Sequence, residues 1–77
     1  MPIIKTEKEW AEAAARHLKA ELKRAEVTYE ELAERLQAHG FSETKASIAN
    51  KLARATMSAH FFLASLAVIG KDSISVA

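Results

Sequence analysis

Basic side chains without acidic neighbours mark the second half of the chain. From Thr44 to Lys71 the sequence contains four basic residues and no Asp or Glu. Asparagine suits the edge of adenine, arginine and lysine suit guanine or phosphate, and serine or threonine suits either. The residues of these types that could contact nucleic acid are Thr44, Lys45, Ser47, Asn50, Lys51 and Arg54. The alternative is a solvated helix face that contacts no partner.

Catalytic and metal-binding chemistry have much weaker support. No two of the three histidines, His17, His39 and His60, lie four residues apart, and cysteine is absent. Glu21 lies four residues after His17, but two ligands on one helix do not make a metal site. No Gly-rich phosphate loop or nucleophile turn occurs. We therefore expect no enzyme activity, no metal, no cofactor and no small-molecule substrate.

Composition limits the fold class. The 77 residues are 49% hydrophobic and 27% charged, which fits one small globular domain spanning 1–77. Two glycines and one proline are too few for an all-β fold with many tight turns, so an all-α bundle is expected. The longest uncharged run, 55–70, is shorter than the roughly 20 residues of a membrane-spanning helix, and the N-terminus lacks a signal core. A cytoplasmic protein without membrane contact is expected.

Helix start and stop signals divide the chain into four helices, at about 6–25, 29–39, 45–54 and 58–69, followed by a tail over 71–77. Thr6 and Thr28 each precede a glutamate by three residues, which is the spacing of a capping box. Thr44 and Ser58 are suitable N-caps for the other two helices. Gly40 is expected in a left-handed conformation, with Phe41 folding back on Leu36.

Apolar spacing predicts which faces are buried. In the first helix the predicted stripe is Trp10, Ala14, Leu18, Leu22 and Ala25, and in the last helix it is Phe62, Leu66 and Ile69, widened by Phe61, Leu63 and Val68. In the third helix Ile48, Ala49 and Leu52 point inward, with Ala53 at the edge of that face. This leaves Ser47, Asn50, Lys51 and Arg54 outward. The tail is expected to fray or to form a short dimer-forming strand.

Two family resemblances are present. Residues 28–36, TYEELAERL, resemble the first element of the phage-repressor (Xre-like) helix-turn-helix domain, and residues 18–70 follow its order of helices. Three features depart from that pattern: the turn before Thr44 is about five residues too long, Ala55 stands where the family has glycine, and the first helix is longer than usual. Either Ile48 or Ala49 then takes the central core position. The stretches TYEELAERL, ASIANKLAR and FFLASLAVIG are also similar to a small bacterial domain family of unknown function.

The first resemblance implies a four- to five-helix, lambda-repressor-like bundle and a DNA-binding transcriptional regulator. Its recognition helix, 45–54, would enter the major groove of double-stranded DNA. Ser47, Asn50 and Lys51 would face base edges, and Lys45 and Arg54 would face phosphates, with backbone N–H groups at Thr44 and Lys45 adding a phosphate contact.

A domain this small makes few DNA contacts, so useful specificity implies a homodimer on a near-palindromic site. The candidate interface residues are Ile3, Ile4, Trp10, Ile74 and Val76. The competing hypothesis is a protein-interaction module on the same scaffold, whose basic strip docks on an acidic partner. The near-neutral net charge of +1 and the acidic second helix favour that alternative.

Overall fold

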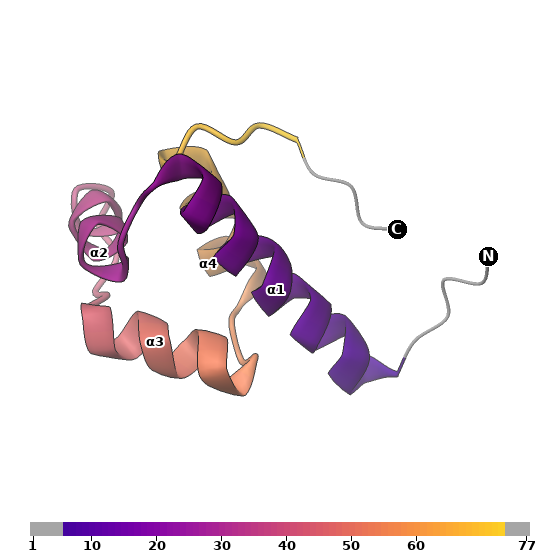
Figure 1. Ribbon diagram of the computed structural model, residues 1–77. Helices are drawn as coiled ribbons and strands as arrows, with labels where there is room; N and C mark the ends of the chain where they lie inside the picture. The colour runs from indigo at the N-terminus through magenta and orange to yellow at the C-terminus, as the bar shows by residue number, and fades with distance from the viewer. Residues whose placement is uncertain (1–5, 74–77) are drawn as a thin grey trace.

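Four helices make up the fold in the computed structural model, which describes residues 6–73 (Figure 1). They are α1 (Glu7–Ala25), α2 (Tyr29–Gln37), α3 (Lys45–Arg54) and α4 (Ala59–Val68), and no strand occurs within the described residues. The expected all-α bundle is confirmed, and each helix boundary lies within two residues of its expected position. The tail beyond Ser73, where a strand was one of the alternatives, lies outside the described residues.

Each helix begins at a hydroxyl side chain that satisfies a free backbone donor. The Oγ1 of Thr6 accepts from the N–H of Glu9 at 3.1 Å, and that of Thr28 accepts from Glu31 at the same distance. The glutamate carboxylates accept in return from the cap N–H groups, so both expected capping boxes are confirmed. The backbone hydrogen bond from Thr28 lowers the pKa of Glu31.

The ends of the helices share one motif as well. Each helix is followed by a residue in the left-handed region. The backbone N–H of the next residue donates to the carbonyl of the residue five positions before it, which is the hydrogen bond of a Schellman motif. The left-handed residues are Glu26, Gly40, Ala55 and Gly70, and the donor–acceptor pairs are Val27–Leu22, Phe41–Leu36, Thr56–Lys51 and Lys71–Leu66. Ala55, at φ 54°, therefore adopts the conformation that the glycine of the resembled family would favour.

The core lies where the four helices meet. Its fully buried members come from every helix: Leu18, Leu32, Leu36, Ile48, Leu52 and Phe61. Ile48 is fully buried and Ala49 only partly, so Ile48 takes the central core position in α3. Leu52 beside it is also buried, whereas Ala53 is exposed.

The predicted stripes of α1 and α4 need correction. In α1, Leu18 and Leu22 are buried as expected, but Ala14 is only half-buried and Trp10 and Ala25 are exposed. Ala13 and Ala15 are buried instead. Ala15 lies on the same side of the helix as Leu18 and Leu22 and belongs to the core cluster with them. Ala13 lies about 200° around the helix from Ala15 and is buried outside that cluster.

In α4, the buried residues are Phe61, Ser65 and Leu66. Phe62 and Ile69, expected in the buried stripe, are only half-buried, and Leu63 is 61% exposed. A helix that is apolar on every side gives no spacing signal for which side is buried.

The first turns of α1 extend past the rest of the bundle. Its earliest residue in the hydrophobic core cluster is Ala15, although the helix begins eight residues earlier. Figure 1 shows this half of α1 running beyond the end of α3. No helix among the described residues is long and apolar enough to cross a membrane.

Candidate nucleic-acid interface

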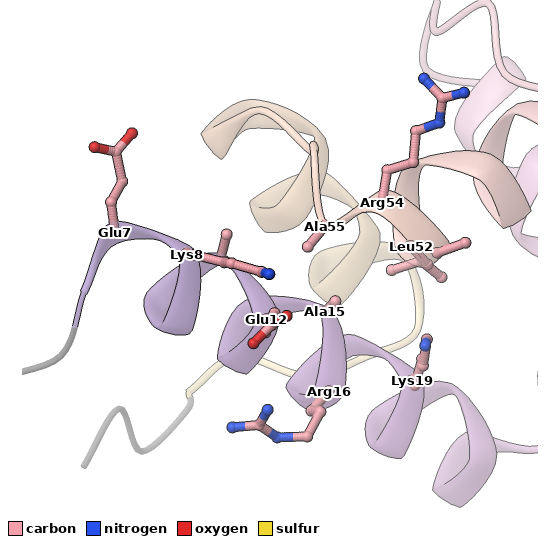
Figure 2. Close-up of a pocket in the computed structure, with 11 residues that line it drawn as sticks. Glu7, Lys8, Glu12, Ala15, Arg16, Lys19, Leu52, Arg54 and Ala55 are labelled. Atoms are coloured by element: carbon pink, nitrogen blue, oxygen red, sulfur yellow. The ribbon is translucent and has the colours of Figure 1, made fainter.

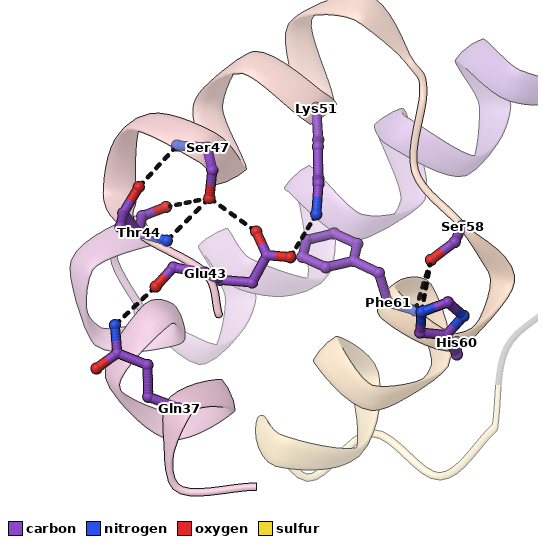
Figure 3. A network of polar contacts seen from close by, with 8 residues as sticks. All are labelled: Gln37, Glu43, Thr44, Ser47, Lys51, Ser58, His60 and Phe61. Carbon is purple, nitrogen blue, oxygen red and sulfur yellow. Dashed lines mark hydrogen bonds and ion pairs between the residues drawn. The ribbon is translucent and has the colours of Figure 1, made fainter. Parts of the chain in front are cut away.

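The connection between α2 and α3, residues 38–44, places a buried carboxylate against α3. Glu43 is 6% exposed, and the backbone carbonyl of Glu43 accepts a hydrogen bond from the side-chain amide of Gln37 at 2.7 Å. The Glu43 carboxylate accepts from the Ser47 hydroxyl at 2.7 Å and forms an ion pair with Lys51. Figure 3 shows these contacts with the ammonium of Lys51 above the ring of Phe61, 4.7 Å from its centroid.

These contacts correct the expected orientation of two residues. Ser47 and Lys51 were expected to face outward, but both are half-buried and turned toward Glu43. The physical reason is the long connection, which returns Glu43 to the bundle. A carboxylate removed from water requires charged or hydrogen-bonding partners, and these two side chains supply them.

The outer face of α3 consists of its exposed residues, Lys45, Ala46, Asn50, Ala53 and Arg54. Asn50 lies on the side of the helix opposite Ile48 and Leu52, so it points directly away from the core. Thr44 is also exposed, but its hydroxyl is occupied as the N-cap of α3 and accepts from the Ser47 N–H at 3.1 Å. At about 100° per residue, Arg54 lies about 40° from Asn50 around the helix, and Lys45 lies about 140° from Asn50 on the other side, with Ala46 and Ala53 between them.

An open groove of about 740 Å³ runs between the first half of α1 and the end of α3. Its apolar lining is small apart from one leucine: Ala11, Ala15, Leu52, Ala53 and Ala55. Its charged lining residues are Glu7, Lys8, Glu12, Arg16, Lys19 and Arg54, which carry four positive and two negative charges. Figure 2 shows the α1 residues along one side of the groove and Arg54 and Ala55 across it.

The four cations of this groove have no ion-pair partner among residues 6–73. Arg24 and Lys71 both pair with Glu21, at 2.7 and 3.6 Å, and Lys51 pairs with Glu43. Lys8, Arg16, Lys19 and Arg54 form no such pair within the described part of the chain. Their charge is therefore available to an anionic partner.

The basic residues of α1 were not among the residues expected to contact a partner, although their spacing carries a signal. At about 100° per residue, Lys8, Arg16, Lys19 and Lys23 fall within an arc of about 80° on the helix. We call these four residues the α1 basic stripe, and all of them are exposed. Glu12 lies inside the same arc, which makes the charges look mixed when they are read along the sequence alone.

Two other expected features bear on this surface. Of the candidate dimer residues, Trp10 is 37% exposed, and Ile3, Ile4, Ile74 and Val76 lie outside the described residues. The described residues contain no cluster of three potential metal ligands.

A domain family described as a domain of unknown function, DUF6471, matches residues 10–74, and the chain belongs to that family. This match spans all four helices except the first turn of α1, and it confirms the resemblance to a small domain family of unknown function. No curated protein and no solved structure matches the chain.

Proposed function

We propose that this member of the DUF6471 family binds double-stranded DNA through the outer face of α3. The observation that carries the proposal is the composition of that face, where Asn50 is flanked by Lys45 and Arg54 with no acidic residue. An asparagine can form two hydrogen bonds with the edge of adenine, and the basic side chains can contact guanine or phosphate. The small side chains of Ala46 and Ala53 allow the helix backbone to approach the floor of the major groove.

The roles within the binding surface follow from orientation. Asn50 is assigned to base edges, Arg54 and Lys45 to phosphates, and the backbone N–H of Lys45 to one further phosphate at the start of α3. The backbone N–H of Thr44, also expected to contact a phosphate, instead donates to the Ser47 hydroxyl at 2.8 Å. Ser47 and Lys51 contribute by holding Glu43 and the connection in place. As in the resembled helix-turn-helix regulators, α2 would lie across the mouth of the groove, and two copies would bind a near-palindromic site as a transcriptional regulator.

A protein-interaction module is the second candidate function. The observation in its favour is the neutralisation of Lys51 by Glu43, which shortens the positive surface of α3. The first turns of α2 add exposed negative charge at Glu30, Glu31 and Glu34. Such a module would have no general affinity for duplex DNA.

Fluorescence anisotropy with a labelled generic duplex, at 50 and 200 mM salt, distinguishes these functions. Two to four phosphate contacts would weaken binding by about 10- to 150-fold over this range, because bound counterions are released. No binding at 50 mM salt by a folded sample would refute the DNA-binding proposal and favour the interaction module.

Variants of α3 then test the roles of its residues. The slope of log K against log salt is negative, and the double variant Lys45→Ala/Arg54→Ala is expected to make it shallower by about 1.8, since each lost phosphate contact removes about 0.9. Asn50→Ala should leave binding to the generic duplex nearly unchanged and should alter the sequences selected from a random duplex library. Unchanged selection would contradict the assignment of Asn50 to base edges.

A further inference from the structure

The α1 basic stripe has the features of a second DNA-contacting surface beside α3. Lys8, Arg16, Lys19 and Lys23 lie on one side of α1, are exposed, and form no ion pair within residues 6–73. Two of the cations that do have a partner, Arg24 and Lys71, share Glu21 on the other side of the helix. α1 therefore has one side on which positive charge is neutralised internally and one on which it is left to solvent.

The stripe also adjoins the proposed recognition helix. The groove that contains Lys8, Arg16 and Lys19 has Arg54 across it (Figure 2). Arg54 and Ala53, which also lines the groove, belong to the outer face of α3. Basic residues from two helices thus line one open groove. The alanines that line the groove have small side chains, which leave the space between the charged residues open.

We propose that the α1 basic stripe and Arg54 together bind the phosphate backbone of the same duplex whose major groove receives α3. This inference rests on the proposed function and adds to it a sequence-independent contact that fixes the orientation of α3. A phosphate backbone is the occupant because it presents a continuous row of negative charges, which matches a row of unpaired cations along a helix. Phosphate contacts of this kind set the register of a protein on DNA.

Glu12 gives the proposal a test with the opposite sign. It lies between Lys8 and Arg16 on the stripe, at four residues from each, and lines the groove. A carboxylate there repels phosphate, so Glu12→Gln should tighten binding to a generic duplex. Asp72→Asn, which removes an exposed carboxylate after α4, is the matched control and should leave the affinity less changed.

The main experiment compares two double variants with equal loss of charge, Arg16→Gln/Lys19→Gln on the stripe and Arg24→Gln/Lys71→Gln at Glu21. Fluorescence anisotropy with the generic duplex is measured at several salt concentrations, and circular dichroism checks that each variant is folded. The stripe variant should make the negative slope of log K against log salt shallower by about 1.8, and the control should keep the wild-type slope.

The possible outcomes separate the two proposals. Absence of binding by the wild-type protein would refute the proposed function, and this inference with it. Wild-type binding that the Lys45→Ala/Arg54→Ala variant weakens, but with equal slopes for the stripe and control variants, would overturn only the role of α1. A shallower salt dependence in the stripe variant but not in the control, together with tighter binding by Glu12→Gln, would establish the role of α1.

Discussion

Glu43 is a carboxylate with little access to water, and its contacts explain why two polar residues of α3 turn inward. Ser47 donates to one carboxylate oxygen, and Lys51 pairs with the other while lying over Phe61. The side chain of Lys51 remains one-third exposed, at 33%, whereas that of Glu43 is 8% exposed. The burial of the pair is thus concentrated on the acid, which depends on Lys51 for its counter-charge.

Removing Lys51 should therefore cost stability rather than affect binding alone. We expect Lys51→Ala to lower the free energy of unfolding by about 1–3 kcal/mol, because a nearly buried carboxylate loses its charged partner. Arg54→Ala, which removes an exposed cation from the same helix, should stay within about 0.5 kcal/mol of the wild type. Urea unfolding measures both. Equal stability of the two variants would mean that the pair with Glu43 contributes nothing.

The structural role of Lys51 makes it a poor probe of DNA binding. A fall in DNA affinity after Lys51→Ala would combine a lost contact with a perturbed connection between α2 and α3. Lys45 and Arg54 are cleaner probes because they are exposed and have no ion-pair partner within the described residues. The sequence alone does not distinguish Lys51 from Lys45 and Arg54, because the partner of Lys51 lies in a loop whose path depends on tertiary packing.

At the scale of the helix, the ends are defined by local chemistry. A hydroxyl cap starts each helix, and a left-handed residue follows each end. Two of the left-handed positions are glycines, where the conformation has no steric cost. The other two, Glu26 at φ 56° and Ala55 at φ 54°, carry a Cβ that this conformation crowds.

Replacing the exposed Glu26 by glycine should stabilise the protein. We expect Glu26→Gly to raise the free energy of unfolding by about 0.5–1 kcal/mol, because it removes the crowded Cβ after α1. Glu26→Ala is the control, since it removes the same charge and keeps the Cβ. Thermal and urea unfolding of the two variants would separate these effects. A glycine variant no more stable than the alanine variant would show that the left-handed position carries no strain.

The helices could be located from sequence because their signals are local. Thr6, Thr28, Thr44 and Ser58 all act as the expected caps, and Gly40 adopts the expected left-handed conformation. The rotation of a helix about its axis was harder to predict. In α1 a run of alanines offers several equivalent faces, and in α4 nearly every position is apolar, so spacing does not select the buried side.

At the scale of the whole molecule, one core joins four short elements without a disulfide. Leu52 belongs to this core at 2% exposure, and its side chain also borders the groove between α1 and α3. The candidate surface therefore rests directly on core packing. The basic charges that adjoin across that groove are more than thirty positions apart in the sequence, so charge patterning along the chain could not bring them together.

Truncating Leu52 should accordingly destabilise the whole fold. We expect Leu52→Ala to lower the free energy of unfolding by about 2–5 kcal/mol, through lost burial and the cavity left behind. Ala53→Ser, at the adjacent exposed position, is the control and should have little effect. Denaturant unfolding monitored by circular dichroism measures the change. A loss near zero for Leu52→Ala would contradict the place of this residue in the core.

The extension of α1 past the bundle has a further consequence for motion. Its first two turns lie ahead of Ala15, where the helix joins the core cluster, so local opening there need not disturb the core. Amide protons in these turns should exchange with solvent much faster than those near Leu18 and Leu22. If the α1 basic stripe binds phosphates, Lys8 sits on the part that opens most readily. Binding would then suppress fraying of this end, and part of the electrostatic gain would be offset by lost conformational entropy.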